Sequence, residues 1–152
     1  MSGPATHREL FERVRTHLLA QGRPSLDRSG GCVYRSPEGL RCAVGALIPD
    51  GAYHPGLEGL GASSDCVMDV LVDAGVVPAG CVPSSPVMDM LDSLQYVHDT
   101  CPHGLWAAAL DRLESAGLTG EDWIPPSGRP GLTLAGAIVR ELAPDGHGRR
   151  PE

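Results

Sequence analysis

Apolar residues near the start of the chain recur every fourth position, which is the spacing of one face of a helix. They are Leu10, Val14 and Leu18. Thr6 comes before them and Glu9 follows three residues later, as in a capping box that closes the first turn of a helix. The pattern therefore predicts an amphipathic helix from Thr6 to Gln21, which Gly22 and Pro24 end.

Four further segments show the same periodicity between start and stop signals. Ser63 or Ser64 starts the first of these segments and Gly75 ends it. Ser85 with Pro86 starts the second, Gly117 ends the third, and Thr133 starts the fourth. The residues expected to face the core are Val67, Val70, Leu71 and Ala74; Val87, Leu91, Leu94 and Val97 or His98; Trp106, Ala109, Leu110 and Leu113; and Leu134, Ile138 and Leu142. These segments predict helices joined by short connections.

The stretch after the first helix shows turn chemistry in place of helical periodicity. Ser36-Pro37-Glu38-Gly39 is typical of a type I turn, with proline at the second position and a glycine that can take the left-handed conformation. The turn predicts a β-hairpin in which Tyr34 lies opposite Cys42. Cys32, Tyr34 and Cys42 would then share one face, with the two thiols about 7 Å apart.

An alternative for the same stretch is a short helix from Cys42 to Leu47, closed by Pro49. The residues from Asp50 to Ala62 are rich in glycine and proline and predict a loop. At 152 residues the chain has the size of one domain. We therefore predict a mainly α fold of about five helices with a small β-hairpin, a single compact α+β domain over residues 1–144, and a flexible tail at 145–152.

Charge and hydropathy exclude several classes of partner. The net charge is −7 and no basic stripe is present, so nucleic acid is not an expected partner. No apolar run is long enough to span a bilayer, and no signal-type apolar core follows the N-terminus, so we expect no membrane partner and a cytoplasmic location. The five cysteines would then be reduced, and their odd number argues against a disulfide framework.

Thiols and imidazoles in this sequence suggest a metal site. Cys32, Cys42, His54 and His98 are ligands of the type that zinc prefers, and they are the candidate metal ligands here. Their spacing is not that of a structural zinc finger. The alternative is that the cysteines pack against the helices as small apolar side chains. Zinc or another transition metal is the only cofactor that the sequence suggests.

Two other kinds of chemistry can be built from the same region. Cys42 follows Arg41, which lowers the pKa of a thiol, so a thiol nucleophile is one hypothesis. Its candidate catalytic partners are Tyr53, His98 and Asp99. Because adjacent residues of a helix point about 100° apart, we do not expect Asp99 to orient the His98 ring. The candidate ligand-binding residues are Tyr34, Arg35, Asp50 and Glu58, since a guanidinium can bind a carboxylate or phosphate in two places.

Two blocks of the chain resemble a pattern in small bacterial and phage proteins that have no established function. The first block is Cys32-x-Tyr34-Arg35, Gly39-x-x-Cys42-Ala43-x-Gly45-x-Leu47-Ile48-Pro49-Asp50, Tyr53 and Leu57-Glu58-Gly59; the second is Leu94-Gln95-x-x-His98-Asp99 followed by Trp106 and Leu113. The resemblance covers residues 32–59 and 94–113. It implies kinship and a shared constellation made of Cys32, Tyr34, Arg35, Cys42, Asp50, Tyr53, Glu58, His98 and Asp99.

Two functions remain as hypotheses. The first is a small cytosolic binding or regulatory protein that uses the Cys32–Glu58 segment, with His98 and Asp99, to hold a small molecule or a partner protein. The second is a small thiol- or metal-dependent enzyme, such as a biosynthetic tailoring enzyme, with the same residues in its site. The first rests on the compact, acidic, helical character of the chain, and the second on the density of ionisable groups in the two blocks.

Overall fold

A computed structural model describes residues 6–62, 64–120 and 130–144. The α-helices are α1 (His7–Gln21), α2 (Asp65–Asp73), α3 (Pro86–Thr100), α4 (Trp106–Ser115) and α5 (Pro130–Leu142). Short 3-10 helices are η1 (Gly45–Leu47), η2 (Asp50–Ala52), η3 (Pro55–Leu57) and η4 (His103–Leu105). The mainly helical fold that the apolar periodicity predicts is confirmed.

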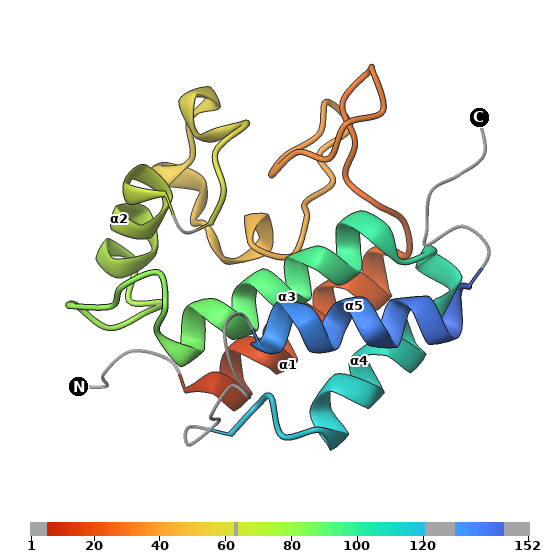
Figure 1. Ribbon diagram of the computed structural model, residues 1–152. Coiled ribbons are helices and arrows are strands. Elements are labelled where there is room, and N and C mark those ends of the chain that lie inside the picture. The colour runs from red at the N-terminus through yellow and green to blue at the C-terminus, as the bar shows by residue number, and fades with distance from the viewer. Residues whose placement is uncertain (1–5, 63, 121–129, 145–152) are drawn as a thin grey trace.

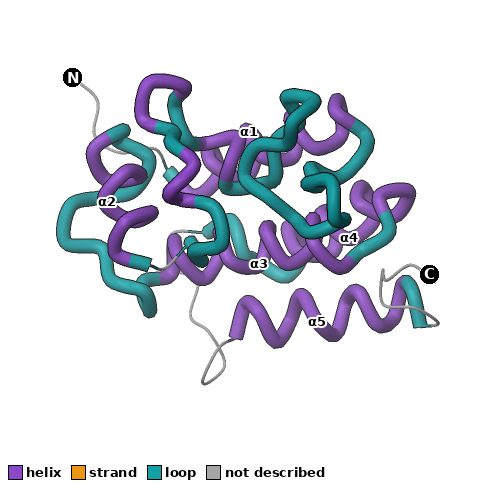
Figure 2. Tube along the Cα trace, turned by 90° about the horizontal axis from the view of Figure 1, so that it is seen from above, coloured by secondary structure: helices purple, strands orange, loops and turns teal. Residues whose placement is uncertain are grey.

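Helix α3 lies at the centre of the helical group. It contacts α1, α4 and α5, and Figure 1 shows these helices side by side, with α2 at one end. The chain between α1 and α2, orange to yellow in Figure 1, runs over α3 and forms only three-residue helices. Seen from above, this chain consists mostly of loop between the helices (Figure 2). We call residues 22–61 the irregular segment.

The helix boundaries follow the capping signals. The Thr6 hydroxyl accepts from the Glu9 N–H at 3.1 Å, and the Glu9 carboxylate accepts from the Thr6 N–H at 2.8 Å, so the capping box forms. At α2 the Ser64 hydroxyl accepts from the Val67 N–H at 3.4 Å, without a reciprocal bond. Helix α5 begins at Pro130 and not at Thr133 as predicted, because proline suits the first turn of a helix.

The predicted β-hairpin is wrong, although its turn forms. Within the described ranges the only β pairing is two isolated bridges, Leu26 with Cys32 and Arg35 with Arg41. The bridge between the arginines has the predicted register, and Gly39 has the left-handed φ of 89° that the turn needs.

The strand pairing stops after this bridge because the groups that would form its next hydrogen bond have other partners. A longer ladder needs the Tyr34 N–H to donate to the Cys42 carbonyl. That N–H donates instead to Glu58, and the carbonyl accepts from the Ala46 N–H at 3.0 Å. The second bond starts the turn that leads into η1. A short helix therefore does form in this stretch, but it covers only Gly45–Leu47 and does not begin at Cys42 as the alternative predicted.

The buried apolar residues form one core to which all five helices contribute. The irregular segment adds Tyr34, Cys42, Ala43, Val44, Leu47, Ile48 and Leu57. Ala74, predicted to face this core, is exposed because α2 ends at Asp73.

None of the helices in the described part of the chain combines the length and apolarity that crossing a bilayer requires. The predicted tail at 145–152 lies outside the described residues.

Gly45 packs closely against the backbone of Tyr34 in the irregular segment. A Cβ atom at this position would come 2.2 Å from the Tyr34 carbonyl oxygen, a backbone atom that cannot move aside without displacing the chain. We expect Gly45→Ala to lower the free energy of unfolding by about 2–4 kcal/mol, measured by urea denaturation. Gly51→Ala is the control, because a Cβ there meets nothing within 4 Å. Equal stability of the two variants would contradict the close approach.

Candidate functional site

The Glu58 carboxylate holds together three parts of the irregular segment. Its Oε1 accepts from the Tyr34 N–H at 2.9 Å, and its Oε2 accepts from the Arg35 N–H at 3.1 Å and from the Tyr53 hydroxyl at 2.7 Å. Backbone donors that lack a strand partner need an acceptor from elsewhere, and a carboxylate accepts more strongly than a neutral group does. We call Glu58 with these three donors the Glu58 clasp.

Two arginines lie beside the clasp and share one counter-ion. Nη2 of Arg35 lies 2.9 Å from Oδ1 of Asp50, and Nη2 of Arg41 lies 2.8 Å from the same oxygen. The Arg35 guanidinium also donates to the Ile48 carbonyl at 2.8 Å and lies over the Tyr53 ring, 4.8 Å from its centre. The predicted ligand-binding residues are therefore neighbours in the structure.

The two tyrosines of this region act as neutral groups. Tyr34 is buried and its hydroxyl donates to the Leu60 carbonyl, and burial raises its pKa. Desolvation also raises the pKa of Tyr53 to about 12, and the hydrogen bond to Glu58 acts in the same direction. The sequence predicts Tyr53 as a catalytic residue, but a phenol with this pKa keeps its proton at neutral pH.

His98 is buried on α3, and both of its ring nitrogens have partners. The Ser25 N–H donates to Nε2 at 2.9 Å, and Nδ1 lies 2.7 Å from Oδ1 of Asp99. Because Nε2 accepts, the proton of the neutral ring is on Nδ1 and is donated to Asp99. The expectation that Asp99 would not orient this ring is wrong, since side-chain torsions overcome the offset of neighbouring residues on the helix.

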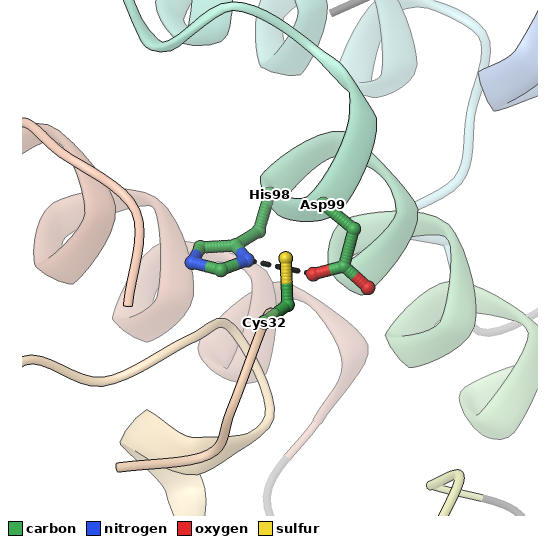
Figure 3. A group of neighbouring side chains, drawn as sticks. All are labelled: Cys32, His98 and Asp99. Atoms are coloured by element: carbon green, nitrogen blue, oxygen red, sulfur yellow. Dashed lines mark hydrogen bonds and ion pairs between the residues drawn. The ribbon is translucent and has the colours of Figure 1, made fainter. Parts of the chain in front are cut away.

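Cys32 completes a small group with His98 and Asp99, drawn in Figure 3. One ligand atom from each side chain lies within 4.8 Å of the others. The chain places Cys32 opposite the end of α3 through its bridge to Leu26. We call these three residues the His98 group. Of the four predicted metal ligands, it contains Cys32 and His98; His54 is exposed and Cys42 is buried outside it.

The proton positions of the His98 group do not fit a zinc ion as they stand. Zinc would have to replace the proton on Nδ1, and the ring proton would then move to Nε2. There it would face the Ser25 N–H, which is itself a donor. The amide of Ser25 therefore opposes metal ligation by His98, and Cys32 and Asp99 alone make an incomplete tetrahedral set.

His98 also lacks the geometry of a catalytic base for Cys42. In a nucleophile–histidine–carboxylate arrangement, Nε2 faces the nucleophile and Nδ1 faces the carboxylate. Here Nδ1 does face Asp99, but the position opposite Nε2 is taken by the backbone of Ser25. The Cys42 sulfur lies elsewhere in the core and accepts from the Gly45 N–H at 3.3 Å.

The thiols themselves are held in the protonated form. Burial raises the pKa of Cys42 to about 12, although the Gly45 N–H acts in the opposite direction. Burial, the charge of Asp99 and a hydrogen bond to it raise the pKa of Cys32 to about 12, although the residue as a whole is exposed. A raised thiol pKa lowers the thiolate fraction at neutral pH, so neither sulfur is activated as a nucleophile.

Gln95 connects the two sequence blocks and is not among the predicted site residues. Its Oε1 accepts from the Val44 N–H at 3.0 Å, and its Nε2 donates to Oδ1 of Asp99 at 2.8 Å. The spacing of Gln95 and Asp99, four residues apart on a helix, is the sequence signal that could have indicated this contact. Ser25 is also missing from the predicted site, and no local signal marks an amide whose partner is 73 positions away.

Comparison with models of protein families, with curated proteins and with solved structures finds no match to this chain. Its function therefore has to be inferred from the geometry of its own residues.

The order of thiol reactivity tests whether a cysteine is activated. We expect iodoacetamide at pH 8 to modify the exposed Cys66 first, and Cys42 slowest. With a pKa of about 12, the thiolate fraction of Cys42 at this pH is on the order of 10⁻⁴. Its reactivity should keep rising about tenfold for each pH unit above pH 8, since only the thiolate attacks. Mass spectrometry of tryptic peptides measures the order, and preferential modification of Cys32 or Cys42 would support the enzyme hypothesis instead.

Proposed function

We propose that this chain is a small binding protein, with a ligand-recognition surface in the Cys32–Glu58 segment. His98 and Asp99 support that surface from α3 and do not carry out chemistry. The observation that carries this proposal is that the ionisable groups make hydrogen bonds inside the protein. Glu58 accepts three such bonds, and both ring nitrogens of His98 have partners within the chain.

Internal use of these groups favours binding over catalysis for a physical reason. A general base needs a free lone pair within reach of a substrate proton, and a nucleophile needs a lowered pKa. The lone pair of Nε2 of His98 is taken by an amide, and the pKa values of Cys32 and Cys42 are raised. What these groups do supply is rigidity, which lowers the entropy lost when a ligand binds.

The part of the Cys32–Glu58 segment that remains available to bind a ligand is the surface around Arg35. Arg35 keeps 19% of its side chain exposed, Arg41 keeps 35% and Asp50 keeps 77%. The backbone beneath Arg35 is fixed by Glu58. A fixed backbone that carries partly exposed charged side chains is suited to recognising a polar ligand.

Amide spectra of the ¹⁵N-labelled full chain test this proposal. The probes are separate mixtures of sugar phosphates, mononucleotides, dicarboxylates, polyamines and neutral amino acids at millimolar concentration. We expect at least one mixture to shift the amide signals of Tyr34 and Arg35, while amides of α4 such as that of Ala109 stay in place. Binding at millimolar to micromolar affinity is sufficient for detection by this method.

Two outcomes would contradict the proposal. One is that no mixture shifts the Tyr34 and Arg35 signals, or that shifts appear only elsewhere in the chain. The other is chemical conversion of a component, followed in the proton spectrum of the same sample, which would favour the enzyme hypothesis. Tyr53→Phe provides a matched variant: loss of its hydrogen bond to Glu58 should change the bound-state shifts of these two amides. Tyr96→Phe on α3 is its control.

A further inference from the structure

Arg35 and Arg41 are held opposite one another although they carry the same charge. They form the isolated antiparallel bridge of this region, so their side chains leave the backbone on the same face. Like charges directly opposite one another destabilise a strand pair. Both guanidinium groups converge on a single carboxylate oxygen, Oδ1 of Asp50, at 2.9 and 2.8 Å. The pair of cations thus defines a point at which an anionic oxygen is favoured.

The backbones of both arginines and the guanidinium of Arg35 are held by contacts other than Asp50. The Arg35 backbone N–H is held by Glu58, and its guanidinium is held by the Ile48 carbonyl. The Arg41 N–H donates to Oε1 of Gln21 at 2.9 Å, and its carbonyl accepts from Nε2 of Gln21 at the same distance. Little further freedom is lost when an anion binds to donors that are already positioned.

One donor of Arg35 has no acceptor. Its Nε atom is buried and has no hydrogen-bond partner among the residues that the structure describes. A buried donor without a partner destabilises the folded state, which makes such groups rare in native proteins. Nε and the adjacent Nη atoms of a guanidinium form the fork that binds carboxylate and phosphate oxygens in two places. Asp50 contacts Nη2 of Arg35 and leaves the neighbouring Nε of this fork without an acceptor.

Asp50 is suited to be displaced. Its side chain is 77% exposed, and the structure records ion pairs through Oδ1 alone. Because this carboxylate is mostly solvated, its ion pairs contribute little, and it can turn away from the arginines at small cost. A ligand oxyanion that engages Nε of Arg35 as well would have the advantage over it.

We infer that Arg35 and Arg41 form an oxyanion site, where the carboxylate or phosphate group of a small ligand replaces the Asp50 carboxylate. This inference rests on the proposed binding function and names the chemical class of the group that is bound. Asp50 acts as an internal competitor, which holds the like-charged pair together when no ligand is present.

Titrations of the ¹⁵N-labelled full chain with inorganic phosphate, acetate and chloride, at matched ionic strength, test the inference. The signal to follow is the Nε–H resonance of Arg35. We expect saturable shifts with phosphate or acetate and none with chloride. The phosphate and acetate arms show which oxyanion the site prefers.

Three variants separate the site from general charge effects. Asp50→Asn removes the competitor, so the dissociation constant for the preferred oxyanion should fall about threefold or more. Arg41→Gln should raise it about tenfold, because one charge-assisted contact is lost. Arg13→Gln removes the same charge from an exposed position on α1 and should leave the dissociation constant unchanged. Dispersed amide spectra of each variant show that it is folded.

Several results would overturn the inference. They are unsaturable shifts with both oxyanions, an Asp50→Asn variant that binds no more tightly, or equal weakening by Arg41→Gln and Arg13→Gln. The proposed binding function can survive this failure: a polyamine that shifts the Tyr34 and Arg35 amide signals would keep the binding surface and exclude an oxyanion as the group that is bound. If none of the five ligand mixtures shifts these amides, the binding function itself fails.

Discussion

The irregular segment depends on side chains that supply hydrogen bonds which a β-sheet would otherwise make. Glu58 accepts from the N–H groups of Tyr34 and Arg35, and Gln95 accepts from that of Val44. Buried amides without acceptors would cost enough to unfold a small domain, so these contacts are a condition for burying the segment's apolar residues. The polar network and the core of this region are therefore inseparable.

The helices were predictable because their signals are local. Thr6 and Glu9 are three positions apart, and each caps the other within the same turn. The hairpin failed for the opposite reason. Its turn residues are also local and do form the turn. The Tyr34 N–H, however, donates to a carboxylate 24 positions away and not to the opposite strand. A single sequence shows that Glu58 is acidic and gives no indication of which amides it will reach.

Residues that the sequence analysis singled out lie together in the structure. Arg35, Asp50 and Tyr53 gather around Glu58, and Cys32 lies beside His98. Residue types alone suggested metal ligation and thiol chemistry. Hydrogen-bond partners change that interpretation: a backbone amide faces Nε2 of His98, and Cys42 is buried in the core.

The Glu58 carboxylate takes the place of a strand partner, and native-state amide hydrogen exchange of Glu58→Gln tests this role most directly. An amide side chain cannot accept at both of its terminal atoms, so one of the two backbone donors must lose its acceptor. We predict exchange about tenfold or more faster at whichever of the Tyr34 and Arg35 amides loses its acceptor, with unchanged exchange at Ala109 of α4. Glu38→Gln, an exposed change in the same segment, should leave all these rates as they are. Unchanged exchange at Tyr34 and Arg35 in Glu58→Gln, or an equal increase throughout the chain, would contradict this role of Glu58.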